Sequence, residues 1–544
     1  MRIFAVLGVF VWSLTAHAQA KADACAPPPS GAAPSLPARL LPGQGEVHFA
    51  ITTSNPEAQK FFDQGLNQMH SFWAVEAERS FLQAAQLDPE APMPWWGVAM
   101  VAAGDYRPRF QIDTANRVFG PNRDPRIVAK RAIDAAEKAE RLSQVSGKAT
   151  DIEKLYIASI SGRRNPPRGV DSDDAYIAGL RAIVKQHPKE IEAKTFLALH
   201  TMRGFTLPDR QPREGSMEAV QLLRELLVEA PDHPGVHHYV IHGFEGSTFA
   251  KDAWPSCKRY AELVPNIPHA LHMPGHIYSQ TGRWADAAKS FRDAAENELR
   301  WIHADKLYGR GHHGHNVHYL STALAFSGQY DQAIEEARSL LAFQENPREA
   351  AQIDGFFNVY RQGWFAMLRA LVQGERWDQI LEGKTLPAYG KPREQIWTHW
   401  ARGLAFAAKG DAKSAAAEAK LMDASMKEFN DKVKRAPSEE LQTARIELDA
   451  QVAAAAGRIK RAISQFEKAM AKERAMVYSE PPYYPRPVAI PLAQLAAKRN
   501  MRDKAEKAYH AALEQFPAYA KAEDGLRQLQ GGGATSTNTS SGGN

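Results

Sequence analysis

Histidine is distributed unevenly along this chain of 544 residues, and the dense region carries side chains well suited to binding a metal. Of the 19 histidines, 12 lie between His233 and His318. Within this window His238 and His242, like His272 and His276, are four residues apart. That spacing brings two side chains to one face of an α-helix, with Cβ atoms about 5 to 6 Å apart. Each pair offers two imidazoles to one ion, and an all-imidazole pocket suits Zn, Cu, Ni or Fe.

An internal repeat identifies the elements that must position these histidines. Two segments match the residue spacing of the 34-residue tetratricopeptide repeat (TPR), a pair of antiparallel helices. The matching residues are Phe61, Gly65, Ala77, Phe81, Ala84 and Pro89, and then Gly275, Tyr278, Gly282, Ala287, Phe291 and Ala294. Helical periodicity continues between these segments, whereas strand-like alternation is scarce. We therefore predict an all-α fold, a TPR solenoid of stacked antiparallel helix pairs that form a concave groove.

Aligning the repeats superposes the histidines of three successive first helices. His238 then matches His272, and His242 matches His276. In the third helix His315 matches His269, and His318 matches His272. These positions line the ligand-binding groove of TPR proteins, so the resemblance implies that the histidines face one space. The predicted metal ligands, not all binding at once, are His238, His242, His269, His272, His276, His315 and His318.

Carboxylates near these histidines are further candidates. Glu245 lies one turn beyond His242, and Asp305 precedes the third helix. Glu480 begins the segment EPPYY (480–484), which the repeat does not explain. This segment is either a loop that folds back over the groove or a plain turn between helices. Glu480 and Glu245 are the candidate catalytic residues, as general bases or additional ligands.

The remaining histidines are assigned ordinary structural roles. We expect a core position for His237 and polar or core positions for His70, His200 and His399. Surface or capping positions are expected for His233, His303, His312 and His313. Pro274 lies between two candidate ligands, where it removes a backbone hydrogen bond and kinks the helix, unless the helix begins later.

Several longer motifs are more specific than the repeat itself. They are FLQAAQLDPEAPMPWWGVAM, HHYVIHGFE, HALHMPGHIYSQTGRW, GHNVHYL and SEPPYY. Together they resemble a group of exported bacterial TPR proteins of similar length, over most of the mature chain. That group has no firmly assigned chemistry. The resemblance therefore implies a fold, export and a shared site, without naming a reaction.

The first 20 residues predict export. Arg2, an apolar stretch and small residues up to Ala20 form a secretory signal peptide (1–20), so we expect a periplasmic or secreted protein. The apolar stretch is too short to span a bilayer, and no later segment is long and apolar enough.

A flexible Pro/Ala-rich lead-in (21–55) precedes the solenoid (56–530). Loops are inserted near 104–125, 161–172, 203–216 and 384–395, and a disordered Gly/Ser/Thr tail (531–544) follows.

Composition narrows the possible partners and cofactors. The net charge is only +5, and basic residues are interleaved with acidic ones along helices, which argues against nucleic-acid binding. The chain contains no CxxCH motif, which argues against covalent haem. Cys257 falls at a core position and is expected to be a buried thiol, although an oxidising compartment permits pairing with Cys25.

Three classes of function follow from these observations. The first is a solenoid whose groove binds a transition metal, together with a peptide or protein ligand. The second is a metal-dependent enzyme that uses the same histidines. The third is a metal-free scaffold for protein partners. The chain lacks a nucleophile motif, a phosphate-binding glycine loop and a dinucleotide fingerprint, so metal chemistry is the enzymatic option with support.

Overall fold

The computed structural model describes residues 37–108, 125–145, 147, 149–304, 308–344, 358–434, 436–476, 479 and 481–531. The predicted signal peptide, Cys25, Asp305, Glu480 and the tail from residue 532 onward lie outside these ranges.

Every regular element in this part of the chain is helical, apart from one isolated bridge between Phe205 and Pro212. The N-terminal half contains α1 (Pro56–His70), α2 (Ala74–Leu87), α3 (Met93–Val101), α5 (Pro125–Val145), α6 (Asp151–Arg164), α7 (Ser172–Gln186), α8 (Ile191–Thr201), α9 (Ser216–Glu229), α10 (Pro234–Phe244), η1 (Ala250–Ala253), α11 (Trp254–Leu263), α12 (Pro268–Gln280) and α13 (Trp284–Ala304). The C-terminal half contains α14 (Gly311–Phe326), α15 (Tyr330–Leu341), α16 (Val359–Gln373), α17 (Trp377–Glu382), α18 (Pro392–Ala408), α19 (Ala412–Val433), α20 (Glu439–Ala455), α21 (Ile459–Arg474), α22 (Ala489–Lys498), α23 (Arg502–Gln515) and α24 (Ala520–Gly531). Among these helices, none combines the length and apolarity needed to cross a membrane.

Successive helices pack as pairs through the small residues that the repeat predicts. α1 packs on α2, α12 on α13 and α18 on α19. A Cβ atom built on Gly65 would lie 2.7 Å from the ring of Phe81, and Gly275 is pressed as closely against Phe291. Glycine is therefore required where the two helices of a pair touch. These contacts confirm the predicted TPR-type solenoid.

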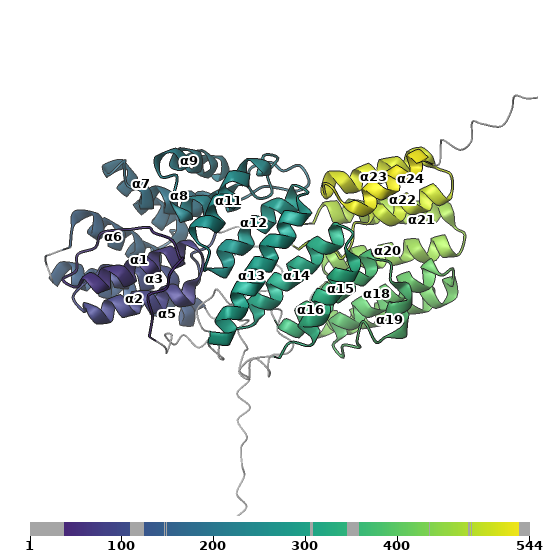
Figure 1. Ribbon diagram of the computed structural model, residues 1–544, viewed down its shortest axis with the longest axis horizontal. Helices are drawn as coiled ribbons and strands as arrows, with labels where there is room; N and C mark the ends of the chain where they lie inside the picture. Colours follow the sequence, from purple (N-terminus) through teal and green to yellow (C-terminus); the bar gives the residue numbers. More distant parts are fainter. Residues whose placement is uncertain are drawn as a thin grey trace, which may run out of the picture.

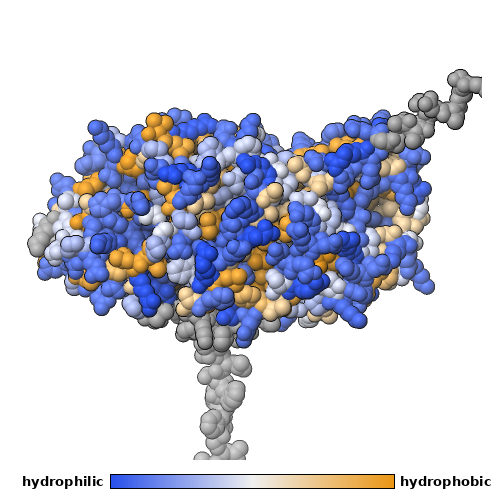
Figure 2. Space-filling view, viewed as in Figure 1, coloured by the Kyte–Doolittle hydropathy of each residue, from blue (hydrophilic) through white to orange (hydrophobic). Residues whose placement is uncertain are grey.

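The described residues form two large hydrophobic cores and a small third one. One large core runs from Val47 to Ile277 and the other from Trp284 to Ala522, while the small core joins Ala295, Val317, Leu340 and Val359. Figure 1 shows the two groups of helices, with α12, α13 and α14 between them. In the view of Figure 2, hydrophilic side chains cover most of the surface and apolar ones are scattered. Trp284 begins α13 and packs in the second core.

The N-terminal half closes on itself. α1 contacts α10, although the two helices are far apart in sequence. A hydrogen bond from the imidazole of His238 to the carbonyl oxygen of His70 joins them, across 168 residues. On the inner side of these repeats, the N-terminus of the solenoid therefore contacts α10, the helix that carries His238 and His242.

The last part of the expected lead-in, residues 37–55, is packed along this half. The amide of Val47 donates to Asn67 Oδ1 at 3.1 Å, and the amide of Thr52 donates to Glu153 Oε1 at 2.6 Å. The carbonyl oxygen of Gly43 accepts from the amide of Asn266 at 2.9 Å. These contacts fix the segment against α1, α6 and the start of α12.

Candidate metal centre

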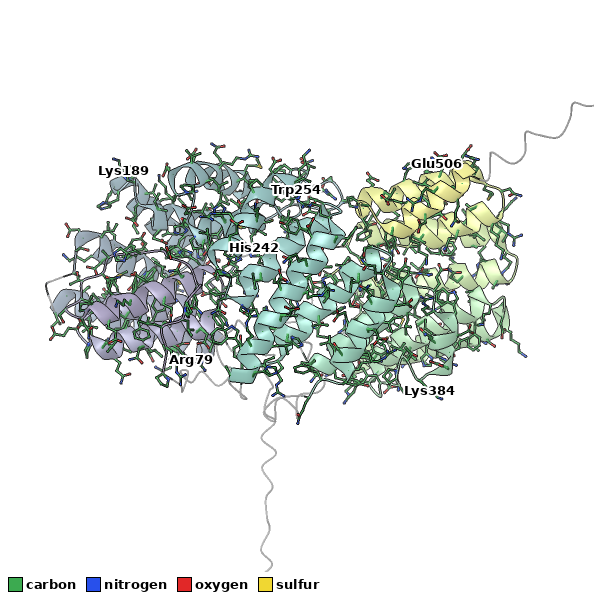
Figure 3. All side chains as sticks on the ribbon, viewed as in Figure 1. Arg79, Lys189, His242, Trp254, Lys384 and Glu506 are labelled. Atoms are coloured by element: carbon green, nitrogen blue, oxygen red, sulfur yellow. The ribbon has the colours of Figure 1, made fainter. Side chains whose placement is uncertain are left out.

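Two consecutive inner helices present the paired histidines. His238 and His242 lie on α10, and His272 and His276 lie at the equivalent positions of α12. The Nε2 atoms of His238 and His242 are 3.1 Å apart, and those of His272 and His276 are 2.8 Å apart. In Figure 3 His242 lies near the middle of the molecule, whereas Lys189 and Glu506 lie at its edges. Each predicted pair therefore points two nitrogens at a common space.

These separations suit two ligands of one ion. With metal–nitrogen bonds of about 2.0 to 2.1 Å, adjacent imidazole nitrogens lie about 2.9 Å apart at a right angle and about 3.3 Å apart at the tetrahedral angle. The alternative is a hydrogen bond between two imidazoles, in which one Nε2 carries a proton and the other accepts it.

The opposite ring nitrogens indicate which protonation state is present. Nδ1 of His238 contacts the carbonyl oxygen of His70, which only accepts hydrogen bonds. Nδ1 of His276 lies 2.7 Å from Glu245 Oε1. Both Nδ1 atoms therefore carry the proton, so Nε2 of each ring is deprotonated and directs its lone pair toward Nε2 of the other histidine of its pair. A metal ligand needs this tautomer.

Glu245 supports a histidine of each pair. It caps the C-terminus of α10, and its two carboxylate oxygens lie 2.7 Å from Nδ1 of His276 and 3.6 Å from Nδ1 of His242. Burial alone would raise the pKa of the Glu245 carboxyl, but the charge and hydrogen bonds of these two histidines lower it to about 2. Glu245 thus places a carboxylate on the Nδ1 side of both rings, and such a carboxylate is a common partner of histidines that bind a metal.

His269 extends the first pair. One ligand atom from each of His238, His242 and His269 lies within 4.8 Å of the other two. Nε2 of His269 is shielded from solvent and has no hydrogen-bond partner. Buried polar atoms are rarely left unpaired in proteins, so this nitrogen points to an absent ligand. Phe72 covers the group, with ring centroids 4.4 Å from His238 and 5.6 Å from His269.

Burial disfavours the charged form of the imidazoles. His238 is 0% exposed, His272 1% and His242 2%. Desolvation by burial is the main cause that lowers the pKa of all three, and it lowers the pKa of His269 and His315 in the same way. Neighbouring histidines lower these pKa values further. Neutral imidazole is the form that binds a metal, so the lowered pKa values favour the protonation state that metal binding needs.

Of the two histidines that were predicted as ligands on the third helix, α14, only His315 lies against the rings of the second pair. The ring of His315 lies 4.9 Å from that of His272. His318 turns toward α16, where its Nδ1 lies 2.6 Å from Gln362 Oε1. Burial, together with the charge of Arg369, lowers the pKa of His318 to about 3. His315 therefore joins the cluster. Nδ1 of His318 is engaged by Gln362, while its Nε2, like that of His269, is buried and has no hydrogen-bond partner.

His312 is a member of the cluster that sequence reasoning placed at the surface or in a cap. It is buried, and its Nδ1 lies 3.0 Å from Glu298 Oε2. Its ring lies 5.7 Å from that of His315 and 6.1 Å from that of His272. The three-residue spacing between His312 and His315 places both on one helix face, and this signal was available in the sequence.

A second group, His70, Glu192 and His233, also lies within ligand distance. Glu192 accepts hydrogen bonds of 2.8 Å from Nε2 of both histidines. Nδ1 of His233 accepts from the amide of Val236, and Nδ1 of His70 lies 3.0 Å from the hydroxyl of Tyr239. All four ring nitrogens are engaged, so this group ties α1, α8 and α10 together. His233 caps α10 as predicted, but it is buried.

The described part of the EPPYY segment belongs to the C-terminal half. Arg369 of α16 donates to the carbonyl oxygens of Pro482 at 2.6 Å and Tyr484 at 3.1 Å. The hydroxyl of Tyr484 donates to Glu447 of α20. Residues 481–484 are thus an anchored connection between α21 and α22, and Glu480 itself lies outside the described residues.

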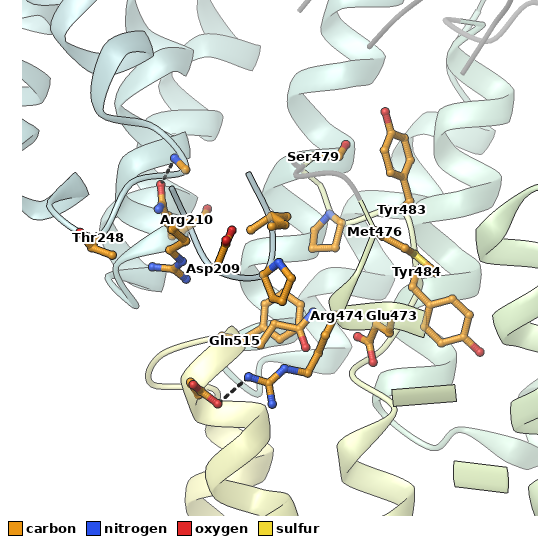
Figure 4. Close-up of a pocket in the computed structure, with 18 of the residues that line it drawn as sticks. Asp209, Arg210, Thr248, Glu473, Arg474, Met476, Ser479, Tyr483, Tyr484 and Gln515 are labelled. Atoms are coloured by element: carbon orange, nitrogen blue, oxygen red, sulfur yellow. Dashed lines mark hydrogen bonds and ion pairs between the residues drawn. The ribbon is translucent and has the colours of Figure 1, made fainter. Parts of the chain in front are cut away.

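A cavity of about 380 Å³ lies where α10 and α12 end (Figure 4). Gly246, which follows Glu245, and Gln280, one turn beyond His276, form part of its wall and are hydrogen-bonded at 2.9 Å. The inserted loop around Arg210 lines one side, and Met476 and Tyr483 line the other. This volume is in the range of small-molecule sites, and the cavity adjoins the histidine helices.

No family model matches this chain, and no curated protein matches it in sequence. Similar solved structures include a human IFIT1 dimer with m7Gppp-AAAA (11% identity, TM-score 0.33, 89% of this chain and 92% of that chain). Others are yeast Tom70 (12%, 0.34, 88% and 96%) and the APC/C hetero-tetramer Cut9-Hcn1 (11%, 0.28, 87% and 76%). These values carry no argument about ligands, and the fold assignment rests on the helix pairs described above.

Proposed function

We propose that this protein is a TPR-type scaffold that binds a transition metal in a buried imidazole centre. The ligands are drawn from His238, His242 and His269, with His272 and His276 on the next repeat. The observation that carries the proposal is the orientation of the rings. Hydrogen-bond acceptors engage Nδ1 of His238 and His276, while each pair brings its Nε2 atoms to within 3.1 Å or 2.8 Å.

The chemistry of the donors limits the metal. Neutral imidazoles favour Zn, Cu, Ni or Fe over Ca or Mg, which prefer oxygen ligands. The buried carboxylate of Glu245 supplies negative charge behind the ligands and so compensates part of the charge of a bound cation. Metal carriage and metal-dependent assembly of a partner both need such a centre.

A metal-dependent enzyme is the second candidate function. The cavity at the ends of α10 and α12 favours it, because its lining residues Gly246 and Gln280 lie one and four residues beyond Glu245 and His276. A small molecule or a peptide bound in this cavity would be the candidate substrate of an ion with an open coordination position. An ion whose ligands all come from the protein would favour carriage or a structural role.

We also propose that the mature protein acts in the periplasm or outside the cell, on the basis of the signal-peptide pattern in residues 1–20. The mass of the mature N-terminus, measured on protein expressed with its own leader, tests this. A mature protein that retains residue 1 would contradict export by cleavage.

Elemental analysis tests the metal proposal directly. Tag-free protein purified from its native compartment should contain a transition metal in a fixed ratio to protein. Calorimetry with Zn and Cu should show a large loss of affinity for His272→Ala. His303→Ala and His510→Ala serve as controls, because both histidines are exposed, and these variants should bind metal as tightly as wild type. Equal affinities across the set, or no binding by wild type, would leave the metal-free scaffold as the better hypothesis.

A further inference from the structure

The two histidine pairs are copies of one feature, produced by the repeat. His238 and His272 are 34 residues apart, as are His242 and His276, and this is the length of one TPR unit. Each pair lies on the first helix of its unit, α10 or α12, and these helices contact each other. The solenoid has therefore duplicated a two-nitrogen arrangement along its axis.

The ligand atoms of the two pairs do not gather at one point. Among the described residues, His269 of α12 reaches the first pair, with one ligand atom of each of His238, His242 and His269 within 4.8 Å of the others, and this group does not include His272 or His276. Within each pair, by contrast, the Nε2 atoms already have the spacing of adjacent ligands, at 3.1 Å and 2.8 Å. Glu245 contacts Nδ1 of His276 and lies 3.6 Å from that of His242, so it supports one ring in each pair.

We propose that the centre holds two transition-metal ions, one at each histidine pair. His238 and His242, with His269, bind the first ion. His272 and His276 bind the second, and His315 is a further imidazole beside them, with its ring 4.9 Å from that of His272. Glu245 lies behind both sites and reduces the repulsion between the two cations. This inference rests on the proposed metal-binding function.

The next repeat shows why the number is two. His318 of α14 occupies the position of His272, but the residue four positions later, equivalent to His276, is Thr322. The hydroxyl of Thr322 donates to the carbonyl oxygen of His318 at 2.9 Å, and the ring of His318 turns to Gln362. The third repeat thus lacks the paired arrangement, and no third site is expected there.

The stoichiometry of zinc binding tests the proposal. Tag-free full-length protein is stripped with a chelator and titrated calorimetrically with Zn, and bound metal is counted by elemental analysis after gel filtration. We expect two ions in wild type, with the second bound more weakly because the cations repel each other. His242→Ala and His276→Ala should each retain one ion, and His303→Ala should retain two. Circular dichroism verifies that each variant folds.

The outcomes separate this inference from the function on which it rests. One ion in wild type would overturn the two-ion centre and leave the proposed metal binding intact. No ion in wild type would overturn both. Two ions in wild type, with one lost in each single variant, would support both. The wild-type count alone is decisive even if a variant fails to fold.

Discussion

Replacing Glu245 by glutamine probes the residue that links the two histidine pairs. The substitution keeps the shape of the side chain but removes its charge. Its amide oxygen can still accept the hydrogen bond from Nδ1–H of His276, but its amide nitrogen is a donor and then lies on the side of Nδ1 of His242. The substitution therefore removes the negative charge beside both pairs. If the amide turns around, its nitrogen meets Nδ1–H of His276, which must turn or move its proton to Nε2 and so block that lone pair.

The expected magnitude follows from the role of an orienting carboxylate. Loss of such a partner typically lowers metal affinity about 10- to 100-fold, or about 1.4 to 2.7 kcal/mol. Competition against a zinc-binding dye measures this change for wild type and Glu245→Gln. Glu506→Gln is the matched control, because Glu506 also lies beside a histidine, 3.8 Å from His510, but at the exposed surface. Equal zinc affinities for wild type and Glu245→Gln would refute the inferred tautomers.

Four further results are expected. The buried histidines have lowered pKa values, so the unfolded chain binds more protons than the folded protein below pH 6.5. The metal-free protein should therefore lose stability as pH falls through that value, by about 1.4 kcal/mol per pH unit for each histidine. Urea unfolding at several pH values measures this change, and a free energy of unfolding that does not vary with pH would contradict it. Cys257 is buried and its thiol pKa is raised, so it should react with a thiol reagent only after denaturation; fast labelling of native protein would be inconsistent with that burial. Gly65→Ala should destabilise the fold by about 1 to 3 kcal/mol because the new methyl group meets the ring of Phe81. A methyl group on Gly162 meets nothing within 4 Å, so Gly162→Ala should be neutral or stabilising. Thermal melts in which Gly162→Ala is the less stable variant would exclude the proposed packing. His318→Ala should leave zinc binding unchanged because the ring faces Gln362, and reduced zinc content would return His318 to the ligand set.

Local sequence predicted much of the centre because its main geometry is local. Two residues four apart on a helix share a face wherever that helix packs, so the pairs on α10 and α12 were predictable from spacing alone. The same holds for the close contacts of Gly65 and Gly275, since the repeat sets the distance from each glycine to its aromatic partner. The first helix begins at Pro56, as predicted, and Pro274 lies inside α12.

Contacts between distant repeats decided the rest. The bond from His238 to the carbonyl oxygen of His70 spans 168 residues, and that from His276 to Glu245 crosses from one repeat to the next. The turn of His318 toward Gln362 also depends on a different helix. A repeat sequence specifies its own helices and their immediate neighbours, whereas the small rotation between units accumulates along the chain. That accumulated rotation brings α1 against α10, buries the histidines and fixes which ring nitrogens carry the proton, and no pattern within a single repeat encodes it.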